Sequence, residues 1–384
     1  MCSPHGMIEM RMPLQLRSLF LGGIVSLLGT GMVVAAPIIE LTAQGKTYQG
    51  LNIAHNSLEC WIAAQDGSYQ RVELSRVSSF RKTGSEFRSL SATALAGAIK
   101  KSVGKSYEVQ TQGRFVICAP RGQAAGYAEL AGRVEKSFSG YFSRRGWPLK
   151  HADFPLVILV LATEEEFQNV CQSSGTAVGP YLRGFYHPLT NRVTLYDLRD
   201  SVSESSAGFS GRAKSEKLTS IGDSTRQVFV HETIHQLAFN AGLHDRLGDN
   251  PRWVVEGLAT LLEAGALDST NRADTSGRIN VERLRQFQDY RANRRKGTIS
   301  DFILQAESLY ENSPLDFYAE AWAFTFYLAE HRRPDYVRLL KRIASRDKSN
   351  GPYSPEEQLK DLQQVFGKDL RWLETQYLRA IDKL

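Results

Sequence analysis

The spacing of apolar residues divides the chain into a strand-rich first part and a helical last part. Between residues 38 and 82, apolar and polar side chains nearly alternate in short runs, and Asp66-Gly67 marks a turn between two of them. Alternation with a period of two is typical of half-buried strands. We therefore expect four or five short strands that close into a small β-barrel-like unit over residues 38–82.

Residues 85–200 mix the two periodicities. The run Leu156–Leu161 is apolar at every position, as is typical of a strand with both faces buried. The other elements expected here are a helix over 85–103, a hairpin around Gln112-Gly113, a helix over 123–145, a helix from Glu164 behind a Thr163 cap, and two strands, Gly184–His187 and Arg192–Asp197, joined by a turn at Pro188–Asn191. This order predicts an α/β subdomain built on a mixed sheet.

From residue 218 onward, the apolar residues recur at helical spacing. Ser224–Gln227 has the pattern of a capping box that opens a helix, and Pro251 is well placed to open a second one. Further helices are expected over 280–294, 299–309, 314–331, 334–346, 355–366 and 368–382. The predicted fold class is α+β, with the small β unit, the α/β subdomain and a mostly helical part over 218–384.

The length and composition are those of a soluble globular protein. A chain of 384 residues, 42% hydrophobic and 23% charged, can bury at least one large core, and two domains would be ordinary. The net charge of +6 is modest, and the one tight basic run is Arg294-Arg295-Lys296. Such a run is typical of a solvated helix end, so no nucleic-acid partner is expected.

Residues 1–36 have the pattern of a signal peptide. Arg11 and Arg17 precede an apolar stretch, Leu19–Val34, and the small residues Val34-Ala35-Ala36 offer a cleavage site. The apolar stretch also approaches the length of a membrane span, so an uncleaved anchor is the alternative. In both cases we expect an exported protein, in the periplasm, the cell envelope or the extracellular space.

Cysteine usage leaves the disulfide question open. Three cysteines follow the expected signal peptide: Cys60, Cys118 and Cys171. An odd number allows at most one internal disulfide, and the sequence does not indicate which pair would form it. The alternative is three buried thiols. Their spacing matches no cysteine-based zinc site.

The segment His231-Glu232-Thr233-Ile234-His235 carries the candidate chemistry. Residues four apart on a helix point the same way, so the two imidazoles can hold one metal ion. Glu232 lies one position round the helix, where its carboxylate can reach a metal-bound water. Neutral imidazole suits zinc, and a catalytic zinc takes three protein ligands and one water. The alternative is a metal-free pair of helices with both histidines hydrogen-bonded in the core.

A third ligand is expected from the following helix. Twenty residues separate Glu256 from His235, enough for a helix end, a loop and the start of a second helix. His244 is the alternative third ligand, although it is expected to lie in the loop. The metzincin pattern requires Gly at position 238 and His at position 241, and it fails because the chain has Ala238 and Ala241.

These motifs resemble those of the gluzincin zinc metallopeptidases, in which the third ligand is a glutamate on the next helix. The longer pattern H-E-T-I-H-Q-L-A-F-N-A-G-L-H-D-R, followed by N-P-R-W-V-V-E-G-L-A, is similar to that of a bacterial secreted group of gluzincin-like domains, mostly without an assigned function. The resemblance covers residues 223–263. It implies a zincin-like domain in which His231, His235 and Glu256 bind Zn²⁺ and Glu232 acts as the general base.

The resemblance also implies further site residues. Gluzincins commonly place a Tyr or His near the metal to stabilise the oxyanion, and Tyr318 is the candidate here, with core packing as the alternative. A strand beside the metal helix pairs with substrate, so Tyr186 and Arg192 of the predicted hairpin are candidates for substrate binding, with a purely structural strand as the alternative. A carboxylate usually orients a ligand histidine; Thr260 stands one turn after the third ligand, and Glu263 is the alternative orienting residue.

Two functions from different classes follow. The first is an exported zinc metallopeptidase that hydrolyses a peptide or protein substrate. Residues 201–217, rich in Ser, Gly and Lys, would then form either a flap over the cleft or a disordered loop. The second is a zinc-stabilised, non-catalytic envelope scaffold or binding protein that uses the N-terminal β unit as its contact surface. The sequence indicates neither the substrate nor the oligomeric state.

Overall fold

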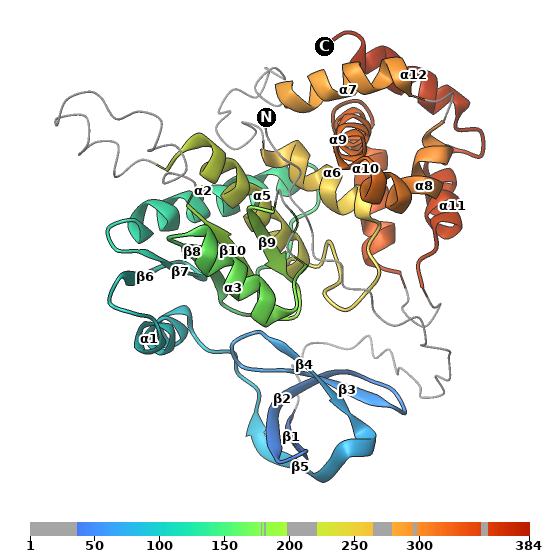
Figure 1. Cartoon of the computed structure of the whole chain (residues 1–384). Coiled ribbons are helices and arrows are strands. Elements are labelled where there is room, and N and C mark those ends of the chain that lie inside the picture. Colours follow the sequence, from blue (N-terminus) through green and yellow to red (C-terminus); the bar gives the residue numbers. More distant parts are fainter. Residues whose placement is uncertain are drawn as a thin grey trace, which may run out of the picture.

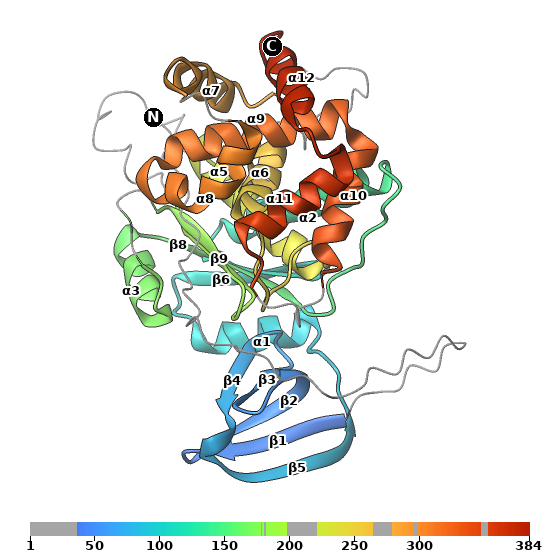
Figure 2. The ribbon, with the colours of Figure 1, turned by 90° about the vertical axis from the view of Figure 1, so that its right-hand side faces the viewer.

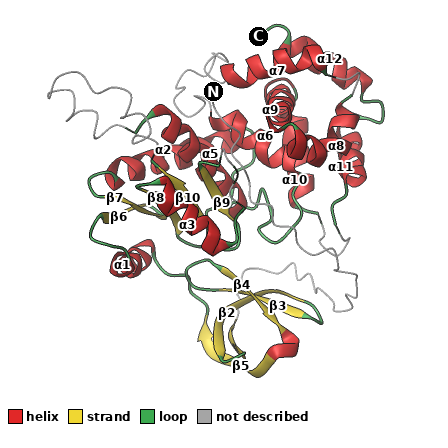
Figure 3. Ribbon diagram, in the orientation of Figure 1, coloured by secondary structure: helices red, strands yellow, loops and turns green. Residues whose placement is uncertain are grey.

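The computed structural model describes residues 37–177, 179, 182–197, 221–263, 279–294, 298–346 and 352–384. Within these ranges the chain forms an N-terminal antiparallel sheet, a second, mixed sheet and eleven α-helices (Figures 1 and 3). Both sheets precede the helical part, so the predicted α+β class is confirmed. The expected signal peptide at 1–36 and the expected loop at 201–217 lie outside the described residues.

Five strands form the N-terminal sheet in the order β4-β3-β2-β1-β5, and every pair is antiparallel. Their bounds are β1 Pro37–Ala43, β2 Lys46–His55, β3 Glu59–Ala63, β4 Tyr69–Glu73 and β5 Val77–Glu86. The prediction of a closed barrel is wrong. A 3-10 turn at Leu74–Arg76 joins β4 to β5, but β5 pairs with β1, so the sheet stays open. The strands shorten from ten residues in β2 to five in β3 and β4. Among the described residues, β4 and β5 do not pair with each other, so no hydrogen-bonded ladder closes the sheet.

The second sheet has the order β6-β7-β8-β10-β9. β8 is parallel to both β7 and β10, and the two outer pairs are antiparallel. The bounds are β6 Tyr107–Gln112, β7 Phe115–Pro120, β8 Leu156–Leu161, β9 Gly184–His187 and β10 Arg192–Tyr196. The central position of β8 confirms the interpretation of its apolar run. Among the described strands β9 pairs with β10 alone, so β9 is an edge strand.

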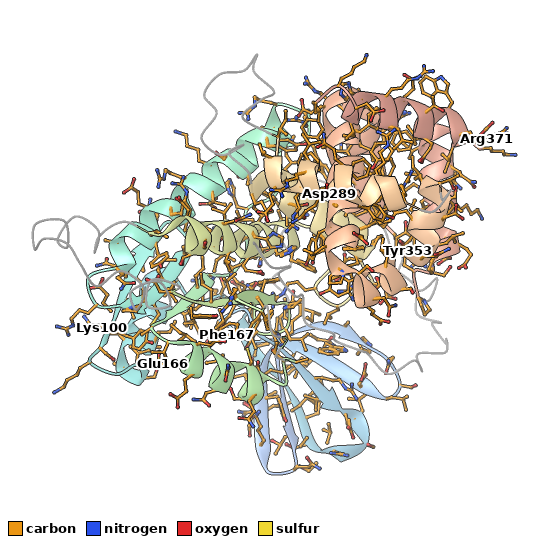
Figure 4. All side chains as sticks on the ribbon, turned by 45° about the horizontal axis from the view of Figure 1, so that its top comes forward. Lys100, Glu166, Phe167, Asp289, Tyr353 and Arg371 are labelled. Carbon is orange, nitrogen blue, oxygen red and sulfur yellow. The ribbon has the colours of Figure 1, made fainter. Side chains whose placement is uncertain are left out.

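Helices cover both faces of the second sheet. α2 (Ala124–Ser143) and α5 (Asp223–Asn240) share one core with one face, whereas α1 (Ala92–Ser102) and α3 (Glu164–Ser174) pack on the other. Phe167 of α3 is 1% exposed and lies on the side of the helix that faces the sheet (Figure 4). Figure 2 shows α1 between the two sheets.

One predicted helix start and one predicted helix cap are wrong. The helix expected from residue 85 begins at Ala92, because strand β5 ends first and the Ser91 side chain then caps the helix. α5 begins at Asp223 without a side-chain cap, so the capping box predicted at Ser224–Gln227 is absent. Several polar residues in one stretch can cap a helix, and tertiary packing decides which of them does so.

The helical part is arranged around α9 (Pro314–His331), which contacts α6, α7, α8, α10 and α12 (Figure 1). Every residue of α9 from Phe317 to Ala329 is buried. The other bounds are α6 Arg252–Glu263, α7 Val281–Asn293, α8 Ile299–Asn312, α10 Arg333–Ala344, α11 Pro355–Phe366 and α12 Arg371–Ile381. Each of these helices was predicted within a few residues. Pro314 and Pro334 lie in the first turns of their helices, as expected.

Arg294 is largely buried, which contradicts the expectation of a solvated basic run. Its side chain is 9% exposed, and it pairs with Glu320 at 2.7 Å and with Glu374 at 2.5 Å. Because burial disfavours the charge more strongly than Arg294 favours it, the pKa of Glu320 is raised to about 7. The rest of the run, residues 295 and 296, lies outside the described residues.

The close approach of α6 and α9 depends on Gly257. A methyl group at this position would lie 2.2 Å from Thr325 Oγ1 and 2.9 Å from the backbone oxygen of Ala321. We expect Gly257→Ala to lower the free energy of unfolding by about 1–3 kcal/mol, because the two helices must move apart. Denaturant unfolding measures the change. In the matched control, Gly97→Ala on α1, the methyl group meets nothing within 4 Å and should stabilise the protein by about 0.5–1 kcal/mol. Equal effects of the two changes would contradict the close approach.

Arg246, in the loop after α5, joins the N-terminal sheet to the turn between β9 and β10. Its side chain donates from Nε to the Pro188 oxygen at 2.8 Å and from Nη2 to the Gly67 oxygen at 2.7 Å. Its guanidinium also lies 3.6 Å from the ring centre of Tyr69. The Tyr69 N–H donates to the Leu189 oxygen at 2.6 Å. These contacts fix the N-terminal sheet on the hairpin that carries the edge strand.

Two observations relate to the expectation of export: the state of the cysteines and the search for membrane-spanning helices. Cys60, Cys118 and Cys171 are buried free thiols, and burial raises the pKa of each of them. The structure thus contains three buried thiols, which was the alternative to one disulfide. No helix within the described ranges has the length and apolar character needed to cross a bilayer. The apolar stretch Leu19–Val34 lies outside those ranges.

Candidate metal centre

Helix α5 presents His231 and His235 on the same side. Both side chains are 1% exposed, and their Nε2 atoms lie 3.0 Å apart. The predicted motif therefore lies within a helix, and its four-residue spacing brings the two rings together. The helix is buried from Val228 to Phe239, so the pair lies in the interior of the protein.

Glu256 of α6 completes a group of three. Its Oε2 atom lies 3.3 Å from His231 Nε2 and 3.6 Å from His235 Nε2. Zinc ligands lie about 2.0–2.1 Å from the metal, so neighbouring ligand atoms of a tetrahedron are about 3.3 Å apart. The three observed separations of 3.0, 3.3 and 3.6 Å bracket this value. The three side chains can therefore hold one metal ion.

The electrostatics of the group favour a positive charge. Burial opposes protonation of His231, but the carboxylates of Glu256 and Glu263 beside it outweigh burial and raise the pKa of His231 to about 10. Burial likewise opposes ionisation of Glu256, yet the two histidines lower its pKa. Both carboxylate oxygens of Glu256 are buried without a hydrogen bond. A buried carboxylate of this kind needs a cation beside it, and a bound metal would supply one.

Glu263 orients His231. Its Oε2 atom lies 2.6 Å from His231 Nδ1, the ring nitrogen opposite the one that faces Glu256. Asn280 Nδ2 donates to Glu263 Oε1 at 2.9 Å, and Gln227 Nε2 donates to the same atom at 3.4 Å. The Thr260 hydroxyl instead donates to the backbone oxygen of Glu256 at 2.7 Å. Of the two predicted orienting residues, the structure places only Glu263 against a ligand ring.

We expect Glu263→Gln to weaken metal binding by about 10- to 100-fold. The amide oxygen is a weaker acceptor than the carboxylate and therefore fixes the His231 ring less firmly. Competition with a chromogenic chelator measures the affinity. Glu356→Gln, an exposed position on α11, is the matched control and should leave the affinity unchanged. An affinity of Glu263→Gln within twofold of the wild type would contradict the orienting role.

The carboxylate of Glu232 lies beside the group, and one of its oxygens is not engaged by other side chains of the core. The side chain is 2% exposed, and its Oε2 atom has no hydrogen-bond partner. Burial raises the pKa of Glu232, and the nearby Glu256 carboxylate adds to the effect, while the two histidines and a hydrogen bond from the backbone N–H of Tyr186 act against it. A carboxylate with a raised pKa is suited to accept and return a proton near neutral pH.

The comparisons with known proteins bear on the same segment. A family model described as a protein of unknown function (DUF1570) matches residues 227–349. This segment spans 123 of the 384 residues and contains all three ligands of the metal group. The search of curated proteins gave no match.

Tyr318 also lies in the matched segment, on α9. Its side chain is fully buried. Burial raises the pKa of its phenol, and the charges of Glu256 and Glu232 raise it further. The structure therefore brings Tyr318 into the field of both carboxylates, as its predicted role requires. Core packing and a role at the metal centre are both compatible with this position.

The hairpin predicted to bind substrate meets the site through its backbone. The Tyr186 N–H contacts Glu232, but the Tyr186 ring packs against Phe239 at 5.3 Å and its hydroxyl donates to Asn191 Oδ1 at 2.9 Å. Arg192 forms an ion pair with Asp66 of the N-terminal sheet at 3.6 Å. The two side chains thus have structural contacts, and it is the edge strand itself that adjoins the metal helix.

His244, the alternative third ligand, is not part of the group of three. It is 3% exposed, and neither ring nitrogen has a hydrogen-bond partner. Burial lowers the pKa of His244 to about 3, and the closeness of His235 contributes. The ring packs against Phe239 with centroids 5.2 Å apart. His244 is therefore a buried neutral imidazole near the metal group.

Proposed function

We propose that the protein is an exported zinc-dependent metallopeptidase of the gluzincin type. The observation that carries the proposal is the juxtaposition of the His231-His235-Glu256 group with the carboxylate of Glu232, one oxygen of which has no hydrogen-bond partner. Structural zinc sites have four protein ligands, whereas a set of two histidines and one glutamate is typical of catalytic zinc in peptidases. Export is proposed from the pattern of residues 1–36.

The surrounding residues suit peptide hydrolysis. Zinc, when bound, supplies a Lewis acid and lowers the pKa of water towards neutrality. Glu232 then takes a proton from the attacking water and delivers it to the leaving amine. The Tyr186 N–H holds the Glu232 carboxylate in place. The Tyr318 hydroxyl donates to the oxygen that gains negative charge, an interaction worth about 3–4 kcal/mol in comparable sites.

The test is cleavage of casein and of a peptide library by the chain without residues 1–36, reconstituted with zinc. Mass spectrometry of the products identifies the bonds that are cut. We expect cleavage that a chelator abolishes and that added zinc restores. A zinc-loaded protein that cleaves nothing in the library would contradict the proposal.

The burial of the site favours a second candidate, a zinc-stabilised envelope scaffold without catalysis. His231, Glu232, His235 and Glu256 are each no more than 2% exposed. The protein loaded with Co²⁺ in place of zinc distinguishes the two candidates, because its visible spectrum reports on coordination. A spectral change on addition of acetohydroxamate would indicate an accessible coordination position and support the peptidase. An unchanged spectrum would support the scaffold.

A further inference from the structure

Arg283 is a buried cation that lacks a carboxylate partner. It lies in the first turn of α7, and its side chain is 2% exposed. Its Nη1 atom donates to Gln286 Oε1 at 2.8 Å. In the described part of the chain no carboxylate lies within ion-pair distance of its guanidinium. A guanidinium keeps its positive charge, and burying a charge without an opposite charge beside it is costly.

Two other arginines with little exposure have more acceptors than Arg283. Arg294 pairs with Glu320 at 2.7 Å and with Glu374 at 2.5 Å. Arg246 donates to three backbone oxygens, at 2.7, 2.8 and 3.3 Å. Arg283 has a single acceptor, the neutral amide oxygen of a side chain on its own helix. Within the described residues, Arg283 thus has no anionic partner.

The position of Arg283 relates it to the metal centre. The N-cap residue of α7, Asn280, accepts from the Arg283 N–H at 3.1 Å and donates to Glu263 at 2.9 Å. Glu263 in turn contacts His231 at 2.6 Å. The Arg283 guanidinium lies 5.0 Å from the ring centre of Tyr318. The first turn of α7 is thus fixed to a metal ligand on one side and covers the candidate oxyanion donor on the other.

We propose that Arg283 binds a carboxylate of the substrate, one residue beyond the scissile bond. This inference rests on the proposed peptidase function and specifies its substrate class. The planar fork of a guanidinium matches a carboxylate through two parallel hydrogen bonds. One residue advances an extended chain by about 3.3–3.6 Å. A carbonyl held at Tyr318 therefore places the carboxylate of the next residue within reach of a guanidinium 5.0 Å from that ring.

The carboxylate can come from two sources: the free C-terminus of the substrate or an acidic side chain. The test uses a peptide that the protein cleaves, shortened so that one residue follows the cleaved bond. Three versions are compared, with an apolar last residue as the free acid, the same residue as the amide, and a glutamate amide. The free acid carries only a C-terminal carboxylate and the glutamate amide only a side-chain carboxylate, whereas the apolar amide has neither.

We expect zinc-loaded wild-type protein to favour at least one carboxylate-bearing peptide over the apolar amide by about 10- to 100-fold in kcat/KM, the range of a charge-assisted hydrogen bond. Arg283→Gln should reduce this preference to near unity, mainly through KM. Arg283→Lys keeps the charge without the fork and should retain only part of the preference. Arg285→Gln, an exposed position on the same helix, is the matched control and should keep the full preference.

Zinc content and the thermal midpoint are measured on every variant. If Arg283→Gln does not fold, Arg283→Lys carries the test. Cleavage of all three peptides at equal rates, or a preference that survives in Arg283→Gln, overturns the inference and leaves the peptidase function standing. Arg283 would then only balance the negative charge of the carboxylates around the metal. Zinc-loaded wild-type protein that cleaves no peptide overturns both.

Discussion

Replacing Glu232 by glutamine is expected to abolish peptide hydrolysis while the metal remains bound. The amide keeps the shape of the side chain and can still accept the hydrogen bond from the Tyr186 N–H. It cannot take a proton from water, and general-base catalysis of this kind contributes about 10²- to 10⁴-fold to the rate. The measurement is kcat on a cleaved peptide, with zinc content determined on the same sample.

The matched control is Glu165→Gln, at an exposed position on α3 far from the metal group in sequence. This variant should have wild-type activity. A Glu232→Gln protein that keeps more than a tenth of the wild-type kcat would exclude Glu232 as the proton acceptor. Loss of both activity and zinc would instead assign Glu232 a role in holding the metal.

Replacing His235 by alanine is expected to remove the metal and to destabilise the protein. Two ligands would remain, and the carboxylate of Glu256, fully buried, would lose one of the two imidazoles that face it. Breaking a buried pair in this way costs about 3–5 kcal/mol. Metal analysis should find one zinc per wild-type chain and almost none in the variant. Chelation should lower the thermal midpoint of the wild type and leave that of the variant unchanged.

His151→Ala provides the control, because His151 is exposed in a loop before β8. It should bind zinc as the wild type does. Equal zinc content in the wild type and His235→Ala would show that the group of three does not form a metal site in solution. The proposed function would then lose its basis.

The elements that could be predicted are those with a strong local pattern. The periodicity of the helical part predicted six helices after Glu256, and the continuous apolar run predicted the central strand β8. The motif on α5 and Glu256 on α6 could be paired because one short loop connects the two helices. In each case the information lies within a few turns of helix or one strand.

The features that escaped prediction depend on contacts between distant segments. Whether the N-terminal strands close into a barrel depends on which strand pairs with β5, and alternation along a strand does not encode its neighbour. Asn280 supports Glu263 across 17 residues of sequence, and Arg283 approaches Tyr318 from another helix. No local sequence pattern identifies Asn280 or Arg283 as part of the site. Tyr186 was assigned to substrate from its place on a hairpin, whereas its ring is used in packing against α5.

The contacts of Arg246 have a consequence for how the chain can be divided. The guanidinium holds the carbonyl groups of Gly67 and Pro188 together, so the N-terminal sheet supports the turn at the end of β9. A fragment that starts after residue 86 would lose this support, and the face of the guanidinium that contacts Tyr69 would become exposed. The strand next to Glu232 would then be free to tilt, so the domain that contains the candidate metal ligands should be expressed together with the small sheet that precedes it.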